Sequence, residues 1–168
     1  YILEDFDNSR IMFGDNTIGA MVVCDSSKQA KKLFELFNEK MQDKVDKKTA
    51  SLILHDIGTK EERKDQIEAF KDGKIDFLFV YNMLLTGFDA PRLKKLYLGR
   101  LVKSHNLLQT LTRVNRRYKN FKYGYVVDFA DIKTEFDATN KAYFEELKAE
   151  YGDEMEHYSS IFKSYEEI

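Results

Sequence analysis

Short apolar runs alternate with longer amphipathic stretches between residues 18 and 130. The apolar runs have the length and composition of buried β-strands. They cover residues 18–24, 50–55, 75–80, 93–98 and 123–129. The stretches between them repeat apolar residues at helical spacing, at residues 29–41, 61–71 and 104–118. Because strands separated by helices pair in parallel through right-handed crossovers, the pattern predicts an α/β fold with a parallel sheet and helices on both faces.

The two ends of the chain have a different pattern. Residues 1–17 are polar and irregular, so we expect a linker or an edge segment there. Residues 131–168 are charged and poor in glycine, with aromatic residues spaced as on a helix, and we expect a C-terminal helical extension. This extension would pack either against another part of a larger protein or back onto residues 18–130. Since the chain opens on Tyr1 rather than methionine, we also expect it to be a piece of a longer protein.

Composition narrows the class of protein. No apolar run approaches the roughly 18 residues of a membrane-spanning helix, so no membrane partner is expected. The single cysteine, Cys24, permits no internal disulfide, and the start of the chain has no secretory pattern, so we expect a cytoplasmic protein. The formal net charge of −2 argues against a chain that binds nucleic acid through its overall charge alone.

The distribution of charge is more informative than its sum. Between Asp89 and Asp128 there is no acidic residue, and ten residues are positively charged. They are Arg92, Lys94, Lys95, Arg100, Lys103, Arg113, Arg116, Arg117, Lys119 and Lys122. This window predicts a local basic surface that attracts phosphate groups, with an accidental clustering of surface charges as the alternative.

Two motifs lie at the start and in the middle of this window. The first places Gly87 and Asp89 on a turn after an apolar run, where glycine allows a positive φ close to a ligand. The second places Gln109, Arg113 and Arg116 at positions i, i+4 and i+7, which is one face of a helix. Paired arginines suit a polyanion because guanidinium is always charged and binds phosphate bidentately.

These residues resemble a known family. Residues 19–130 are similar to the second RecA-like domain of a superfamily 2 motor, whose motifs V and VI have these forms. The segments LLTGFDAP at residues 84–91, HNLLQ at 105–109 and TRVNR at 112–116 are most similar to the motor (R) subunit of type I restriction enzymes. The opening YILEDF is also similar to the approach to this domain in that subunit.

The resemblance implies a large parent protein with an endonuclease domain, two RecA-like domains and a helical region that docks to the methyltransferase core. The parent would be an ATP-hydrolysing type I site-specific deoxyribonuclease that translocates double-stranded DNA. This chain has no G-x-x-x-x-G-K-[S/T] loop, no D-E-x-H-type magnesium box and no nuclease cluster. The resemblance therefore implies that ATP with Mg²⁺ binds mainly to the missing first motor domain, and that the chain alone is inactive. The implied partners are that domain, the nuclease domain, and the methyltransferase and specificity subunits.

The resemblance also implies roles for the motif residues. Arg116 would be the principal arginine finger that reaches the triphosphate, and Arg113 its partner. Gln109 would hydrogen-bond phosphate, ribose or the neighbouring arginine. Asp89 would orient an arginine or contact the nucleotide ribose, and Gly87 would allow the turn beside the ligand. The alternative is that both arginines are ordinary surface residues of a basic helix.

Three hydroxyl residues are the implied contacts to the DNA backbone. Thr86 would offer its hydroxyl to a phosphate, and Ser26 and Ser27 lie where motif IV meets DNA, at a predicted helix N-terminus. Ordinary N-capping explains the two serines equally well. Thr112 departs from the glycine that many superfamily members have before the first arginine, which puts the finer nucleotide geometry in doubt.

Two other functions remain open from the sequence. The domain could belong to a different superfamily 2 DNA or RNA helicase, in which case no nuclease domain would precede it. It could instead be a non-catalytic scaffold that keeps the fold and docks to partners through its acidic C-terminal segment. In a scaffold, the two motif arginines could be replaced without loss of the parent activity.

Overall fold

The computed structural model describes residues 1–85, 87–102, 104–121, 123–130, 137–138 and 141. Residues Tyr1–Ile132 form one compact unit, which is the subject of the following description. The helical extension expected at residues 131–168 lies almost entirely outside the described residues, so that prediction stays a prediction.

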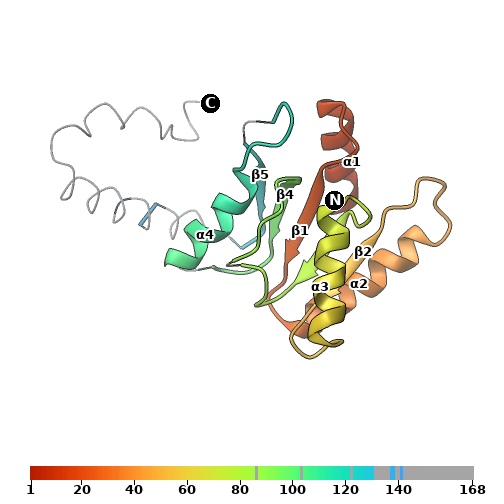
Figure 1. Cartoon of the computed structure of the whole chain (residues 1–168), viewed down its shortest axis with the longest axis horizontal. Helices are drawn as coiled ribbons and strands as arrows, with labels where there is room; N and C mark the ends of the chain where they lie inside the picture. Colours follow the sequence, from red (N-terminus) through yellow and green to blue (C-terminus); the bar gives the residue numbers. More distant parts are fainter. Residues whose placement is uncertain (86, 103, 122, 131–136, 139–140, 142–168) are drawn as a thin grey trace. The chain divides into compact units, whose positions relative to one another are not determined.

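A parallel sheet of five strands forms the centre of this unit (Figure 1). Its strands are β1 (Gly19–Val23), β2 (Ala50–Ile53), β3 (Phe77–Val80), β4 (Leu93–Leu98) and β5 (Tyr125–Asp128). Their order across the sheet is β2-β3-β1-β4-β5, and every neighbouring pair is parallel. β1, β3 and β4 are buried at every position, as expected when helices cover both faces of a parallel sheet, and in β4 this includes Lys94 and Lys95. The α/β prediction is confirmed.

The helices α1 (Ile2–Phe13), α2 (Ser27–Met41), α3 (Lys60–Lys71) and α4 (Ser104–Val114) cover the sheet. α1 and α2 share one face, because Phe6 and Phe37 both place their rings against Phe77. Phe70 of α3 lies on the other face, where it approaches Gly19 so closely that a Cβ there would meet its ring. The helices therefore form the two outer layers that the sequence predicts.

The expectation of a linker or edge segment at residues 1–17 is wrong. Most of this segment is α1, whose Phe6 is fully buried with its ring centroid 4.5 Å from that of Phe77. The inward side carries residues at helical spacing: Ile2, Phe6, Ser9 and Phe13. Gly14 ends the helix with a φ of 60°. The domain therefore begins before residue 18, and the charged residues that made this segment look irregular lie on the outer side of a helix or in ion pairs.

Candidate functional site

The loop between β3 and β4 carries the first predicted motif. Gly87 has a φ of 70°, and nothing lies within 4 Å of where its Cβ would be, so glycine is required here by conformation rather than by space. Leu84 also has a positive φ, of 65°, which is rare for a residue with a side chain. The prediction of a glycine-dependent turn is confirmed, whereas Thr86 lies outside the described residues.

The second motif lies where α4 ends. α4 stops at Val114, so Arg116 is beyond the helix, and the prediction of one helix to residue 118 with both arginines on its face is wrong. The Lys94 ammonium group donates to the carbonyls of Val114 (3.2 Å) and Arg116. A Cβ on Gly124 would lie 2.4 Å from the Val114 carbonyl oxygen. These tertiary contacts turn the chain away from the helix axis at this point.

An ion pair brings the two motifs together. Nη1 of Arg116 bonds Oδ1 of Asp89, and the two side chains are 41% and 55% exposed. An ion pair this exposed contributes at most about 1 kcal/mol, so Arg116 can exchange this carboxylate for another anion at little cost. The interpretation that Asp89 orients an arginine agrees with this contact.

Arg113 lies in the last turn of α4, one residue before the helix ends, and is half-buried. Its Nε is buried without a hydrogen-bond partner, and no ion pair of Arg113 is found within the described part of the chain. Gln109, also half-buried, lies one turn earlier in the same helix. A buried donor without a partner is unfavourable, and an acceptor from a bound anion would satisfy it. The Nε atoms of Arg10 and Arg100 are buried without a partner in the same way.

The Asp89–Arg116 pair lies at the end of the sheet where β4 begins. Lys94 is the second residue of β4, and α4 runs back against the strand direction to end beside it (Figure 1). The pair therefore does not lie at the carboxyl ends of the strands, where ligands of open parallel sheets commonly bind. The physical reason is that the long loop after β3 crosses the sheet before β4 starts.

Ser26 and Ser27 lie at the opposite end of the sheet, after β1. Ser26 is the N-cap of α2: its hydroxyl accepts from the Gln29 backbone N–H (3.1 Å) and donates to Asp25 (2.6 Å). Ser27 is the first residue of the helix. The N-capping interpretation is confirmed for Ser26, and the structure separates both serines from Arg116.

Cys24, just before this helix, is buried in the core. Burial, together with the nearby Asp25 carboxylate, raises the pKa of its thiol to about 12.

A family model described as type I restriction enzyme subunit R domain 3 matches residues 24–131, which is more than half of the chain. The chain belongs to this family. The resemblance to a type I restriction enzyme motor subunit is thereby confirmed.

Two curated relatives show how much of such a protein this domain represents. The endonuclease subunit of a type I restriction enzyme from Staphylococcus aureus strain COL is 43% identical over 75 residues, which is 44% of this chain and 8% of that protein. The corresponding subunit from Staphylococcus saprophyticus is 37% identical over 98 residues, covering 50% of this chain and 10% of that protein. The chain thus spans a small part of the relatives it matches.

Solved structures with the same fold are helicase domains. Domain 2 of the DEAD-box helicase Mss116p, bound to an RNA duplex, superposes with a TM-score of 0.60 at 16% identity, over 82% of this chain and 52% of that chain. The C-terminal domain of the DEAD-box protein Dbp5 superposes with a TM-score of 0.54 at 21% identity, over 90% and 80% of the two chains. At such identities the likeness shows the fold alone, and it confirms the RecA-like class.

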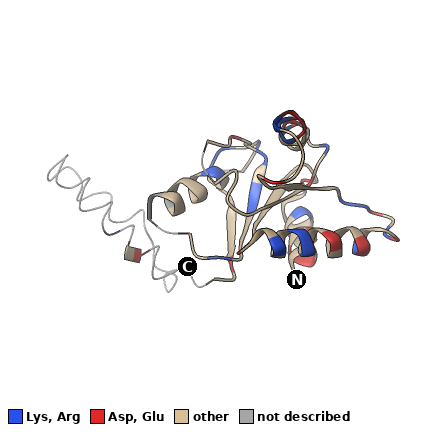
Figure 2. Cartoon of the chain, turned by 90° about the horizontal axis from the view of Figure 1, so that it is seen from below, with Lys and Arg blue, Asp and Glu red and all other residues tan. Residues whose placement is uncertain are grey.

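The basic surface expected on this restriction enzyme domain is smaller than its sequence predicts. Arg92, Lys94 and Lys95 are 3%, 1% and 5% exposed, so they belong to the interior. Arg92 donates to main-chain carbonyls, which are those of Thr17, Phe70 and Ile75. Lys95 pairs with Asp5 (2.7 Å). Figure 2 shows Lys and Arg interspersed with Asp and Glu along α2, so this helix does not present a purely basic surface. The prediction that the whole window is surface is wrong, because a strand buries consecutive side chains on both of its faces.

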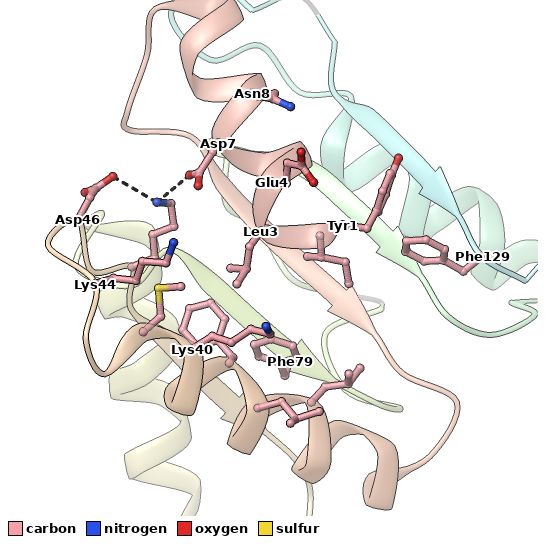
Figure 3. Close-up of a pocket in the computed structure, with 16 residues that line it drawn as sticks. Tyr1, Leu3, Glu4, Asp7, Asn8, Lys40, Lys44, Asp46, Phe79 and Phe129 are labelled. Carbon is pink, nitrogen blue, oxygen red and sulfur yellow. Dashed lines mark hydrogen bonds and ion pairs between the residues drawn. The ribbon is translucent and has the colours of Figure 1, made fainter.

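A cavity of about 750 Å³ lies between α1 and α2 (Figure 3). Leu3 and Phe79 belong to its apolar lining, and at one end the Lys48 ammonium group bonds Asp7 (2.7 Å) and Asp46 (3.2 Å). Burial disfavours the charge of Lys48, but these two bonds outweigh it and raise its pKa. The cavity includes none of the predicted site residues, and so the restriction enzyme domain does not place its arginine motif in this hollow.

Among the described residues of this restriction enzyme domain, no helix is long and apolar enough to cross a membrane. In the same part of the chain, no three His, Cys, Asp or Glu side chains are grouped so that they could hold a metal ion.

Proposed function

We propose that this domain completes the ATPase site of an ATP-dependent motor that translocates double-stranded DNA in a type I restriction endonuclease. The observation that carries the proposal is the contact between the two motifs, in which Asp89 holds the guanidinium of Arg116 at a half-exposed position. The family match supports the same parent protein.

The chemistry proposed for the arginines is charge stabilisation. When ATP hydrolyses, negative charge develops around the transferred γ-phosphoryl group, and a guanidinium placed there lowers the barrier. Arg116 is proposed as the principal finger and Arg113 as its partner, because Arg113 has a buried Nε without an acceptor. Gln109 is proposed to hydrogen-bond the nucleotide, and Gly87 to let the loop backbone approach it.

The nucleotide and its Mg²⁺ are proposed to bind mainly to the first RecA-like domain of the parent. On this domain the half-exposed Arg116 fits a phosphate group because its present partner is a single exposed carboxylate. Under this proposal the active site is composite, so the isolated 168-residue chain does not hydrolyse ATP.

The DNA contacts are proposed to be phosphate contacts from Thr86, Ser26 and Ser27, with sequence recognition left to a separate specificity subunit. The nuclease domain of the parent and the methyltransferase subunit complete the proposed assembly. Binding through phosphates is independent of base sequence and weakens steeply as salt concentration rises.

The test is DNA-stimulated ATP hydrolysis by the full-length protein carrying Arg116→Ala. Loss of an arginine finger should lower kcat by roughly 10³-fold. ATP binding, measured separately, should change little. Arg117→Ala is the matched control, because Arg117 is the adjacent arginine, is exposed and has no proposed role. Near-normal turnover of the Arg116 variant, with correct folding by circular dichroism, would remove Arg116 from the reaction and favour the scaffold alternative.

A further inference from the structure

A buried lysine lies beneath the turn that carries Arg116. Lys94 is 1% exposed, and its Nζ donates to the carbonyl oxygens of Val114 and Arg116. Within the described residues no carboxylate pairs with it. Carbonyls at the end of a helix have no hydrogen-bond donor within the helix and carry partial negative charge. A cationic ammonium group there supplies the donor and neutralises the charge.

The next residue along the strand shows that this arrangement is specific to one face of the sheet. Lys95 is similarly buried, at 5% exposed, but its Nζ bonds Oδ2 of Asp5 in α1 at 2.7 Å. Consecutive strand residues point to opposite faces, so the two lysines hold two different helices. Lys95 is therefore a natural control for Lys94.

Residues 89–94 hold Arg116 at two points. Asp89 bonds its guanidinium, and Lys94 bonds its main-chain carbonyl. We propose that Lys94 is a positioning residue: it fixes the backbone of Arg116 and so determines where the guanidinium can reach. The proposal rests on the proposed function of Arg116.

Gly124 also packs closely against the same turn. An ideal Cβ on Gly124 would lie 2.4 Å from the Val114 carbonyl oxygen and 2.8 Å from Val114 Cβ. The Gly124 backbone N–H also donates to Oδ1 of Asn115 at 3.4 Å. With Lys94 and Gly124 both in contact with it, the backbone around Val114 has little room to move.

The first experiment compares Lys94→Met with Lys95→Met in the full-length protein. Methionine keeps most of the side-chain volume and removes the charge and the donors. A guanidinium displaced by about 1 Å should lower kcat for DNA-stimulated ATP hydrolysis by roughly 10²-fold in the Lys94 variant. The KM for ATP should change by less than about threefold, because the lost interaction stabilises the transition state. Lys95→Met should keep kcat near the wild-type value, and an equal loss in both variants would overturn the proposal.

A double-mutant cycle then separates positioning from a general structural effect. If Lys94 acts only through Arg116, adding Lys94→Met to Arg116→Ala should lower kcat no further. A further loss as large as in the wild-type background would overturn the proposal. Failure of the proposed function looks different, because Arg116→Ala alone would then retain turnover.

A second variant and a structural measurement keep the proposal testable if Lys94→Met does not fold. Gly124→Ala should displace the Val114 carbonyl, and with it the hydrogen bond from Lys94, while the Lys94 side chain stays in the protein, and it should reproduce the selective loss of kcat. Hydrogen exchange at the amides of residues 115–117 should be faster than wild type in Gly124→Ala and in any folded Lys94→Met, but not in Lys95→Met. Unchanged exchange together with unchanged kcat in Gly124→Ala would overturn the proposal.

Discussion

Arg92 and Arg116 lie near the same end of the sheet, yet they differ in burial and in the groups that their guanidinium contacts. Arg92 is 3% exposed and donates to main-chain carbonyls from three separate segments, with its guanidinium 4.8 Å from the centroid of the Phe70 ring. The Arg116 side chain is 41% exposed and forms one ion pair, to a carboxylate that is itself exposed. Burial lowers the pKa of Arg92, and the nearby Asp76 partly offsets this effect.

The comparison teaches how a structural arginine differs from an available one. The N–H donors of Arg92 are bonded to buried main-chain carbonyls, so a ligand could replace these acceptors only if the domain partly unfolded. Arg116 can leave its partner at a cost of about 1 kcal/mol or less. Charge count alone would have treated both residues as parts of one basic surface.

The largest expected difference between a buried and an exposed arginine is in the free energy of unfolding of the domain. Arg92→Met in the 168-residue chain should lower the free energy of unfolding by about 3 kcal/mol or more, because several buried carbonyls lose their donors. Arg117→Met, an exposed change, should stay within about 0.5 kcal/mol of wild type. Urea unfolding followed by circular dichroism measures both variants. Equal stabilities would mean that the carbonyl contacts of Arg92 contribute nothing.

A smaller effect should sharpen the contrast between fold and site. Gly87→Ala and Gly14→Ala both place a side chain at a positive φ, at 70° and 60°, with open space around the new Cβ. Each should cost roughly 1 kcal/mol in thermal unfolding. Only the Gly87 variant should also lower ATP turnover of the full-length protein, since its loop carries Asp89. If the Gly14 variant lowered turnover equally, the loop would have no special role.

The smallest effect concerns pH. The side chain of Asp15 is 12% exposed and bonds Thr17 and Lys119. Burial alone would raise its pKa, but these bonds outweigh burial and lower it. Its contribution is therefore present above the unfolded pKa of about 4 and is lost as pH falls through the lower folded pKa.

Asp15→Asn should be less stable than wild type at pH 7 by under about 1 kcal/mol, and the gap should be narrower at about pH 3, below the unfolded pKa. Urea midpoints at the two pH values measure this difference. A gap that stays constant with pH would show that the Asp15 charge does not contribute to stability.

The strands could be predicted because each apolar run favours a strand through its own composition, which is a local property, although β5 remains partly exposed. α1 had the spacing of Ile2, Phe6 and Phe13 as a signal, but surrounding charged residues hid it. No local pattern distinguishes Lys94 from a surface lysine, because its acceptors come from a turn twenty and more residues later.

The site was predictable in composition but not in geometry. The motif spacing identified Asp89 and Arg116, and the structure pairs them. The helix end at Val114 could not be read from the sequence, since tertiary contacts from Lys94 and Gly124 set it. The spacing of seven residues between Gln109 and Arg116 is the same in the sequence whether the helix continues to Arg116 or ends before it.

The tie between α1 and β4 has a consequence for the order in which the chain acquires structure. The hydroxyl of Tyr97 donates to Asp5 at 2.7 Å across 92 residues of sequence, and Lys95 bonds the same carboxylate. During synthesis α1 emerges well before β4. The Asp5 side chain therefore has no partner until Lys95 and Tyr97 have been synthesised. The early helix and the late strand close a large loop together, a step whose entropic cost grows with the separation and slows folding. In a chain that began at residue 18, β4 would form without Asp5, and Lys95 would be buried without its counter-charge.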